Sequence, residues 1–144
     1  MKYEITHFDR KVFNDITELW NLAGIGKPTR GDTFEIVQST ISHGAKISGI
    51  YVNEKLIATC WITNDWRRLF LHHMAVHPEY QNRGLGARLI EDALDYGKEM
   101  ELQMKLDVHQ DNTVAIHLYT KYGFQPLAGY FQMFRRGFQS WKSK

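Results

Sequence analysis

The stretch VHPEYQNRGLGA, residues 76–87, decides the fold because it joins a strand-like run to a helix-like run. Residues 69–76 read as a strand, and residues 85–100 carry an apolar face at helical spacing. Gly84 and Gly86 lie where that helix is expected to begin. A helix N-terminus leaves backbone N–H groups without partners and carries partial positive charge, which suits a phosphate or pyrophosphate. The alternative is that the two glycines only form a tight turn.

Two other nucleotide-binding motifs are excluded by their spacing. A P-loop requires G-x-x-x-x-G-K-[ST], which neither residues 76–87 nor the glycine-containing segment 24–28 supplies. The dinucleotide fingerprint G-x-G-x-x-G requires a third glycine where this chain has Leu89. The junction therefore predicts a phosphate site of another kind.

Outside this junction, the chain alternates between strand-like and helical patterns. Two further helices are expected before the junction, one over residues 13–23 and a second that Asp32 caps and that ends near His43. A third is expected over residues 112–122. Strands are expected at residues 3–7, 47–52, 56–63, 104–109 and 130–134, with a hairpin at 53–55. This order predicts a mixed α/β (α+β) fold with one main sheet.

Composition limits the class of protein. The 144 residues suit one domain, 43% are apolar and 24% are charged, which is ordinary for a globular chain. The single cysteine, Cys60, lies in an apolar run, so we expect a buried thiol and no disulfide framework. No segment is apolar enough to suggest a signal or a membrane span, so a cytoplasmic location is expected. A net charge of +2 gives no sign of nucleic-acid binding, although the region after Asp111 is basic.

The pattern Gln81-x-x-Gly84-x-Gly86 resembles the acyl-CoA pyrophosphate loop of the GNAT family of N-acetyltransferases. Residues 74–78 resemble that family's fourth strand, and residues 106–108 with 112–124 resemble its fifth strand and following helix. The resemblance implies a single domain over residues 1–144. It also implies the GNAT acyl-CoA N-acyltransferase fold, a mostly antiparallel sheet of six to seven strands flanked by about four helices.

The resemblance also implies which residues contact acetyl-CoA. The pantetheine arm would pair with the backbone of the fourth strand, and the loop would wrap the pyrophosphate. Asn112 matches an asparagine that contacts the arm, although it is equally suited to cap the helix that begins there. The full set of expected cofactor contacts is Met74, Ala75, Val76, Gln81, Asn82, Arg83, Gly84, Leu85, Gly86, Ala87 and Asn112.

Catalytic groups follow from the same resemblance. Tyr119 matches a tyrosine near the thioester sulfur and would act as general acid, unless it is only part of an apolar stripe. The amine must lose a proton, and His72 is the candidate base, Asp107 the alternative base, and an ordered water the third route. Strand alternation is expected to direct His73 to the other face as a hydrogen-bonded structural histidine. The same alternation argues against a metal site at this pair.

These inferences predict an acetyl-CoA-dependent N-acetyltransferase that moves an acetyl group to a primary amine of a small molecule or peptide. The amine would attack directly in a ternary complex, with backbone N–H near Met74 polarising the thioester. The alternative is a non-catalytic acyl-CoA-binding sensor. A homodimer through the aromatic C-terminal residues Phe131, Phe134, Phe138 and Trp141 is also expected. The candidate acceptor-lining residues are Trp20, Arg30, Asp32, Glu35, Trp61, Tyr130 and Phe131.

Overall fold

A computed structural model describes residues 2–5, 7–26 and 31–138. Its elements are, in order, β1 (Lys2–Glu4), α1 (Arg10–Leu22), α2 (Phe34–Ser42), β2 (Lys46–Val52), β3 (Lys55–Asn64), β4 (Leu69–Val76), the 3-10 turn Pro78–Tyr80, α3 (Leu85–Met100), β5 (Met104–Leu106) and α4 (Thr113–Lys121). The sheet order is β1-β2-β3-β4-β5. Neighbouring strands are antiparallel, except that β5 runs parallel to β4. The mixed α/β fold predicted from the sequence is therefore confirmed.

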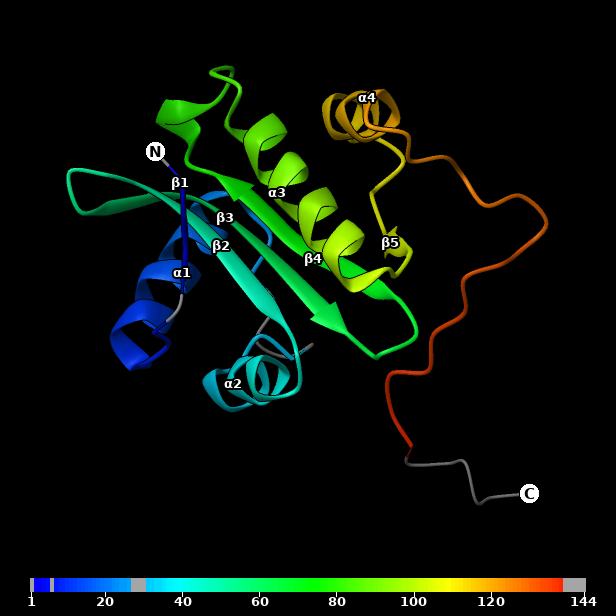
Figure 1. Ribbon diagram of the computed structural model, residues 1–144, viewed down its shortest axis with the longest axis horizontal. Coiled ribbons are helices and arrows are strands. Elements are labelled where there is room, and N and C mark those ends of the chain that lie inside the picture. Colours follow the sequence, from blue (N-terminus) through cyan, green and yellow to red (C-terminus); the bar gives the residue numbers. More distant parts are fainter. Residues whose placement is uncertain (1, 6, 27–30, 139–144) are drawn as a thin grey trace.

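Helices cover both faces of this sheet (Figure 1). On one face, α3 and α4 pack on an apolar cluster that includes Ile62, Leu71 and Leu89. On the other face, α1 and α2 pack on a second cluster that includes Trp20, Val37 and Trp61. The central strand β3 contributes to both clusters because its successive side chains point to opposite faces. The two faces of the sheet thus have separate cores.

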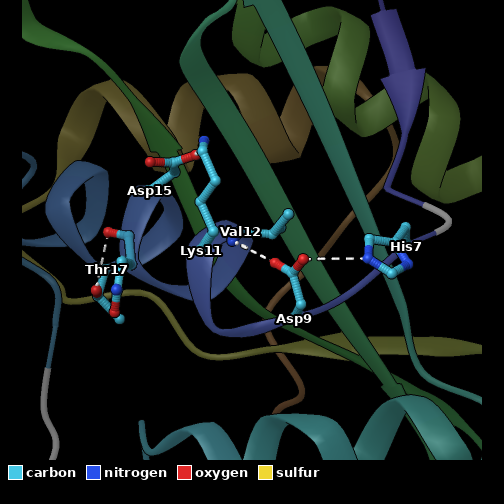
Figure 2. Close-up of polar contacts among 7 residues, drawn as sticks. His7, Asp9, Lys11, Val12, Asp15 and Thr17 are labelled. Carbon is cyan, nitrogen blue, oxygen red and sulfur yellow. Dashed lines mark hydrogen bonds and ion pairs between the residues drawn. The ribbon is translucent and has the colours of Figure 1, made fainter.

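Helices α1 and α2 begin where side chains can satisfy their first N–H groups. At α1, Asp9 Oδ1 accepts a hydrogen bond from the N–H of Val12 at 2.9 Å, and its other oxygen lies 3.1 Å from His7 Nε2 (Figure 2). At α2, the cap is the hydroxyl of Thr33, which accepts from the N–H of Ile36. The prediction that Asp32 caps this helix is wrong, because its carboxylate is turned toward β4 instead.

The expected strand at residues 130–134 is not formed, and the sheet of the described residues has fewer strands than the six to seven expected. The described part of the chain forms five strands, and residues 124–138 leave α4 without joining the sheet (Figure 1). Phe131 is 95% exposed. A strand needs a partner and an alternating pattern, but residues 130–134 read YFQMF and the neighbouring β5 has three residues. The expected strand 104–109 likewise ends at Leu106.

A β-bulge in β4 changes which face its side chains occupy. Cys60 pairs with Met74 and Ile62 pairs with Leu71, so Trp61 alone lies opposite both His72 and His73. The rings of both histidines lie beside the Trp61 ring, with centroids 4.8 and 5.6 Å away. The prediction that the two histidines point to opposite faces is therefore wrong, because the extra residue interrupts the alternation.

Candidate functional site

The N-terminus of α3 differs from those of the other helices. Gly84 occupies its N-cap with φ of 78°, and no side chain caps the helix. Side chains cap the other three helices, including α4, where Asn112 Oδ1 accepts from the N–H of Ala115 at 3.2 Å. A Cβ placed on Gly84 would meet nothing within 4 Å. Neither a capping side chain nor a Cβ at the N-cap therefore obstructs the first turn of α3, the part of a helix that suits a phosphate.

The loop before α3 is held by its own side chains. Gln81 Nε2 donates to the carbonyl of Val76 at 3.2 Å, which ties the loop to the end of β4. The Arg83 guanidinium lies 5.1 Å from the centre of the Tyr80 ring. Asn82 has a left-handed backbone, with φ of 62°. These contacts hold the loop together between β4 and α3.

The second glycine of the motif has a packing role. A Cβ on Gly86 would lie 3.2 Å from Leu118 Cδ2, closer than most side-chain contacts allow. Gly86 therefore permits α3 and α4 to approach one another. Open space thus surrounds the Cα of Gly84, whereas Gly86 faces Leu118 of α4.

Strands β4 and β5 pair along a short ladder and then separate. The pairing joins Leu69–Leu71 to Met104–Leu106, whereas β4 continues to Val76. Among the residues that the structure describes, no strand pairs with residues 72–76 of β4 on the β5 side. Those backbone groups are available to a ligand that adds to the sheet as a strand would.

Tyr119 and Asp107 lie in the wall of one cavity of about 480 Å³ between β5, α4 and the segment after it. Tyr119 is nearly buried, with its ring centroid 5.8 Å from that of Phe124. Burial, with a smaller contribution from Cys60, raises the pKa of Tyr119 to about 12. The phenol is therefore protonated at neutral pH and can donate a proton. Asp107 is exposed and accepts a hydrogen bond from Gln132.

His72 lines a separate cavity of about 320 Å³ with Thr63, Phe70 and Lys105. Its Nε2 lies 2.6 Å from the hydroxyl of Thr63. Partial burial of the ring and the nearby His73 lower the pKa of His72 to about 4, against the opposing effect of Asp32 and Asp107. The imidazole is therefore neutral at physiological pH and has a lone pair. This cavity is distinct from the one that contains Tyr119 and Asp107, but Arg68 and Lys105 line both.

His73 has the hydrogen bond that its sequence position predicts, and the partner is Asp32. Its Nε2 lies 2.9 Å from both carboxylate oxygens of Asp32, which is 6% exposed. The ring also packs edge-on against Trp20 at 4.6 Å. This pair could not be predicted from a local pattern, because the two residues are 41 positions apart.

The residues expected to line an acceptor site separate into several groups. Trp20 and Trp61 are core residues whose indole N–H groups donate to Thr59 and Thr40. Glu35 pairs with Arg10 at 3.2 Å on the surface. Tyr130 and Phe131 are exposed, and Arg30 lies outside the described residues. Of the described members, Trp61 packs against His72, and Asp32 lies close enough to affect its pKa.

Three further features of the described ranges bear on the chemistry of the chain. No group of three His, Cys, Asp or Glu side chains there could hold a metal ion. Cys60 is buried, as predicted, and burial raises the pKa of its thiol to about 12. No described helix has the length and apolar character needed to cross a bilayer.

The chain also matches a known protein family. The acetyltransferase (GNAT) family matches residues 13–124. N-alpha-acetyltransferase RimI of Mycobacterium tuberculosis is 40% identical over 55 residues, which are 38% of this chain and 34% of that protein. The matched stretch is thus well under two thirds of that relative.

Two solved structures share the fold. A probable acetyltransferase from Staphylococcus aureus has a TM-score of 0.72 at 21% identity, covering 94% of this chain and 98% of that one. PaiA N-acetyltransferase from Thermoplasma acidophilum, in complex with coenzyme A, has a TM-score of 0.68 at 20% identity, covering 87% and 90%. At these identities the likeness concerns the fold.

Proposed function

Since this chain belongs to the acetyltransferase (GNAT) family, we propose that it is an acetyl-CoA-dependent N-acetyltransferase acting on a primary amine of a small molecule or peptide. One observation carries the proposal: α3, the first α-helix after β4, begins at a glycine and has no side-chain cap. The single domain would span residues 1–144. The proposal keeps the cytoplasmic location expected from the sequence.

Bound acetyl-CoA would supply the thioester that the amine attacks. We assign its pyrophosphate to the N–H groups of Leu85, Gly86 and Ala87, beside Asn82, Arg83 and Gly84. The backbone of Met74, Ala75 and Val76 would pair with the pantetheine arm, because β4 continues beyond its ladder with β5. Gln81 supports the loop, and Asn112 would reach the arm from the start of α4.

The chain's own residues would then accept and donate the protons of the reaction. An ammonium has no lone pair, so a base must accept a proton from the amine before or during attack. His72 is our first candidate, because it is neutral at physiological pH. Asp107 is the alternative. Tyr119 would donate a proton to the departing thiolate, which fits its protonated state at neutral pH.

Calorimetric titration with acetyl-CoA, dephospho-CoA and ATP tests the cofactor assignment. We expect acetyl-CoA to bind and ATP to bind far more weakly, because the uncapped helix and the open strand edge would act on one ligand together. Chromatographic detection of coenzyme A release with a panel of amines then tests transfer. No acetyl-CoA binding by the folded protein would contradict the proposal.

We also propose a homodimer formed through the C-terminal segment. Phe131, Phe134 and Phe138 are all exposed, whereas Trp141 lies outside the described residues. Exposed apolar residues gathered in one segment favour an interface. Sedimentation of the full chain should give twice the chain mass, and replacing Phe131 and Phe134 with serine should give the monomer mass. A monomer before substitution would contradict it.

A further inference from the structure

The cavity beside His72 has a polar wall built across three strands. Thr63 of β3 pairs with Phe70 of β4, which pairs with Lys105 of β5, so the three side chains lie in one row on one face of the sheet. His72 contacts Thr63 and lies against Phe70, with ring centroids 4.5 Å apart. Arg68, just before β4, completes the wall. The candidate base therefore shares a cavity with two cations.

Arg68 has an unmet hydrogen-bonding requirement. Its Nε is buried and has no hydrogen-bond partner in the structure. Within the described ranges, neither Arg68 nor Lys105 forms an ion pair with a carboxylate. Buried donors in folded proteins are nearly always paired. A ligand that carries an acceptor would satisfy the guanidinium.

The charge of the cavity favours an anionic ligand. Asp65 is the carboxylate in its wall, and its Oδ1 accepts the backbone N–H groups of Arg67 at 2.9 Å and Arg68 at 2.7 Å. These bonds keep the pKa of Asp65 below its usual range and hold it in the turn before β4. Two cations, one engaged carboxylate and a neutral imidazole leave the cavity net positive.

Resting on the proposed function, we propose that the acceptor is an amine that also carries a carboxylate or phosphate, which binds Arg68 and Lys105. A small acid of this kind, such as an α-amino acid, carries its amine and its carboxylate on the same carbon atom. With the anion at Arg68 and Lys105, the amine lies in the same cavity as His72. This narrows the acceptor from any primary amine or peptide N-terminus to small anionic amines.

Matched acceptor pairs test the proposal. Coenzyme A release is measured with free L-α-amino acids against their carboxamides, and with phosphoethanolamine against ethanolamine. We expect kcat/KM to favour the anionic member of at least one pair by roughly tenfold, the scale of one charged hydrogen bond. The first set reports a carboxylate and the second a phosphate.

Substitutions in the cavity wall test whether Arg68 and Lys105 cause the preference for anionic acceptors. Arg68→Gln should raise KM for the anionic acceptor about tenfold and leave KM for its neutral partner within about twofold. Arg67→Gln is the control, because Arg67 is exposed in the same turn and is absent from the cavity wall. If Arg68→Gln fails to fold, Lys105→Gln serves, since Lys105 is exposed on β5. Calorimetry of the same pairs with coenzyme A present gives a readout that is independent of turnover.

Two results would overturn the inference while leaving the transferase intact. One is that neutral and anionic acceptors are used equally well. The other is that Arg68→Gln changes both members of a pair by the same factor. Absence of transfer to every amine, with acetyl-CoA bound, would instead remove the proposed function itself.

Discussion

The two sides of β4 present different kinds of chemical group. On the α3 side, the proposed cofactor contacts are mostly main-chain groups, exposed by Gly84 and by the early end of the β4–β5 ladder. On the α1 and α2 side, the chemistry lies in side chains, since His72 and His73 share that face through the bulge. A site made of main-chain groups depends on the conformation of the backbone. A site made of side chains depends on which amino acid stands at each position. Substitutions should therefore act differently on the two faces.

The largest effect is expected from Tyr119→Phe, on the α3 and α4 side. Removing the hydroxyl should lower kcat roughly a hundredfold or more, the usual contribution of a general acid. The ring and its contact with Phe124 stay, so acetyl-CoA affinity and the unfolding midpoint should change little. Steady-state kinetics with calorimetry measures both. Unchanged kcat would assign Tyr119 to the core alone, and absence of turnover in the unmodified protein would favour the sensor alternative.

The next largest effect is expected from Gly84→Val, which tests whether the backbone conformation at the start of α3 is needed for acetyl-CoA binding. Gly84→Val forces a branched side chain to a φ of 78°, which should weaken acetyl-CoA binding by at least about tenfold. Gly123→Val is a matched control, because Gly123 also has positive φ, at 91°, and open space around it, but follows α4. Both substitutions should cost about 1–2 kcal/mol of unfolding free energy. Equal loss of affinity in the two variants would contradict a specific role for Gly84.

A third prediction concerns the other face. Asp32→Asn keeps the shape of the side chain but removes the charge beside His73, and should lower the free energy of unfolding by about 1–2 kcal/mol. Acetyl-CoA affinity should be unchanged, since Asp32 lies across the sheet from α3. Urea unfolding and calorimetry check the two expectations. Loss of cofactor binding would show that the two faces are coupled.

The smallest expected effect is on how the stability of the folded protein depends on pH. Because the pKa of His72 is about 4 in the folded protein and near 6.5 in an unfolded chain, the unfolded state binds more protons between these values. The contribution of His72 to stability is therefore complete above pH 6.5 and decreases as the pH falls toward 4. His72→Gln should flatten the urea midpoint over this window. The surface that His72 keeps exposed limits the size of the change.

Sequence analysis located the α3 side of the site better than the other side. The strand 69–76 and the helix 85–100 were predicted with the bounds that the structure has, because their periodicity and the two glycines are local signals. The bulge could not be predicted, since it depends on how β4 pairs with β3. The contact of Asp32 with His73 and the cavity of Arg68 likewise join distant residues. The prediction of a strand at 130–134 is wrong because the composition of a segment does not show whether another strand lies beside it to pair with.

The burial of Cys60 gives the molecule a built-in reporter. Cys60 is the only cysteine of the chain, and in the folded protein its thiol is inaccessible and protonated. A thiol-reactive dye should therefore register released coenzyme A without background from the native enzyme. Without substrates, the slow labelling of Cys60 would instead time the transient opening of β3. One residue thus allows turnover and native-state fluctuations to be followed with the same reagent.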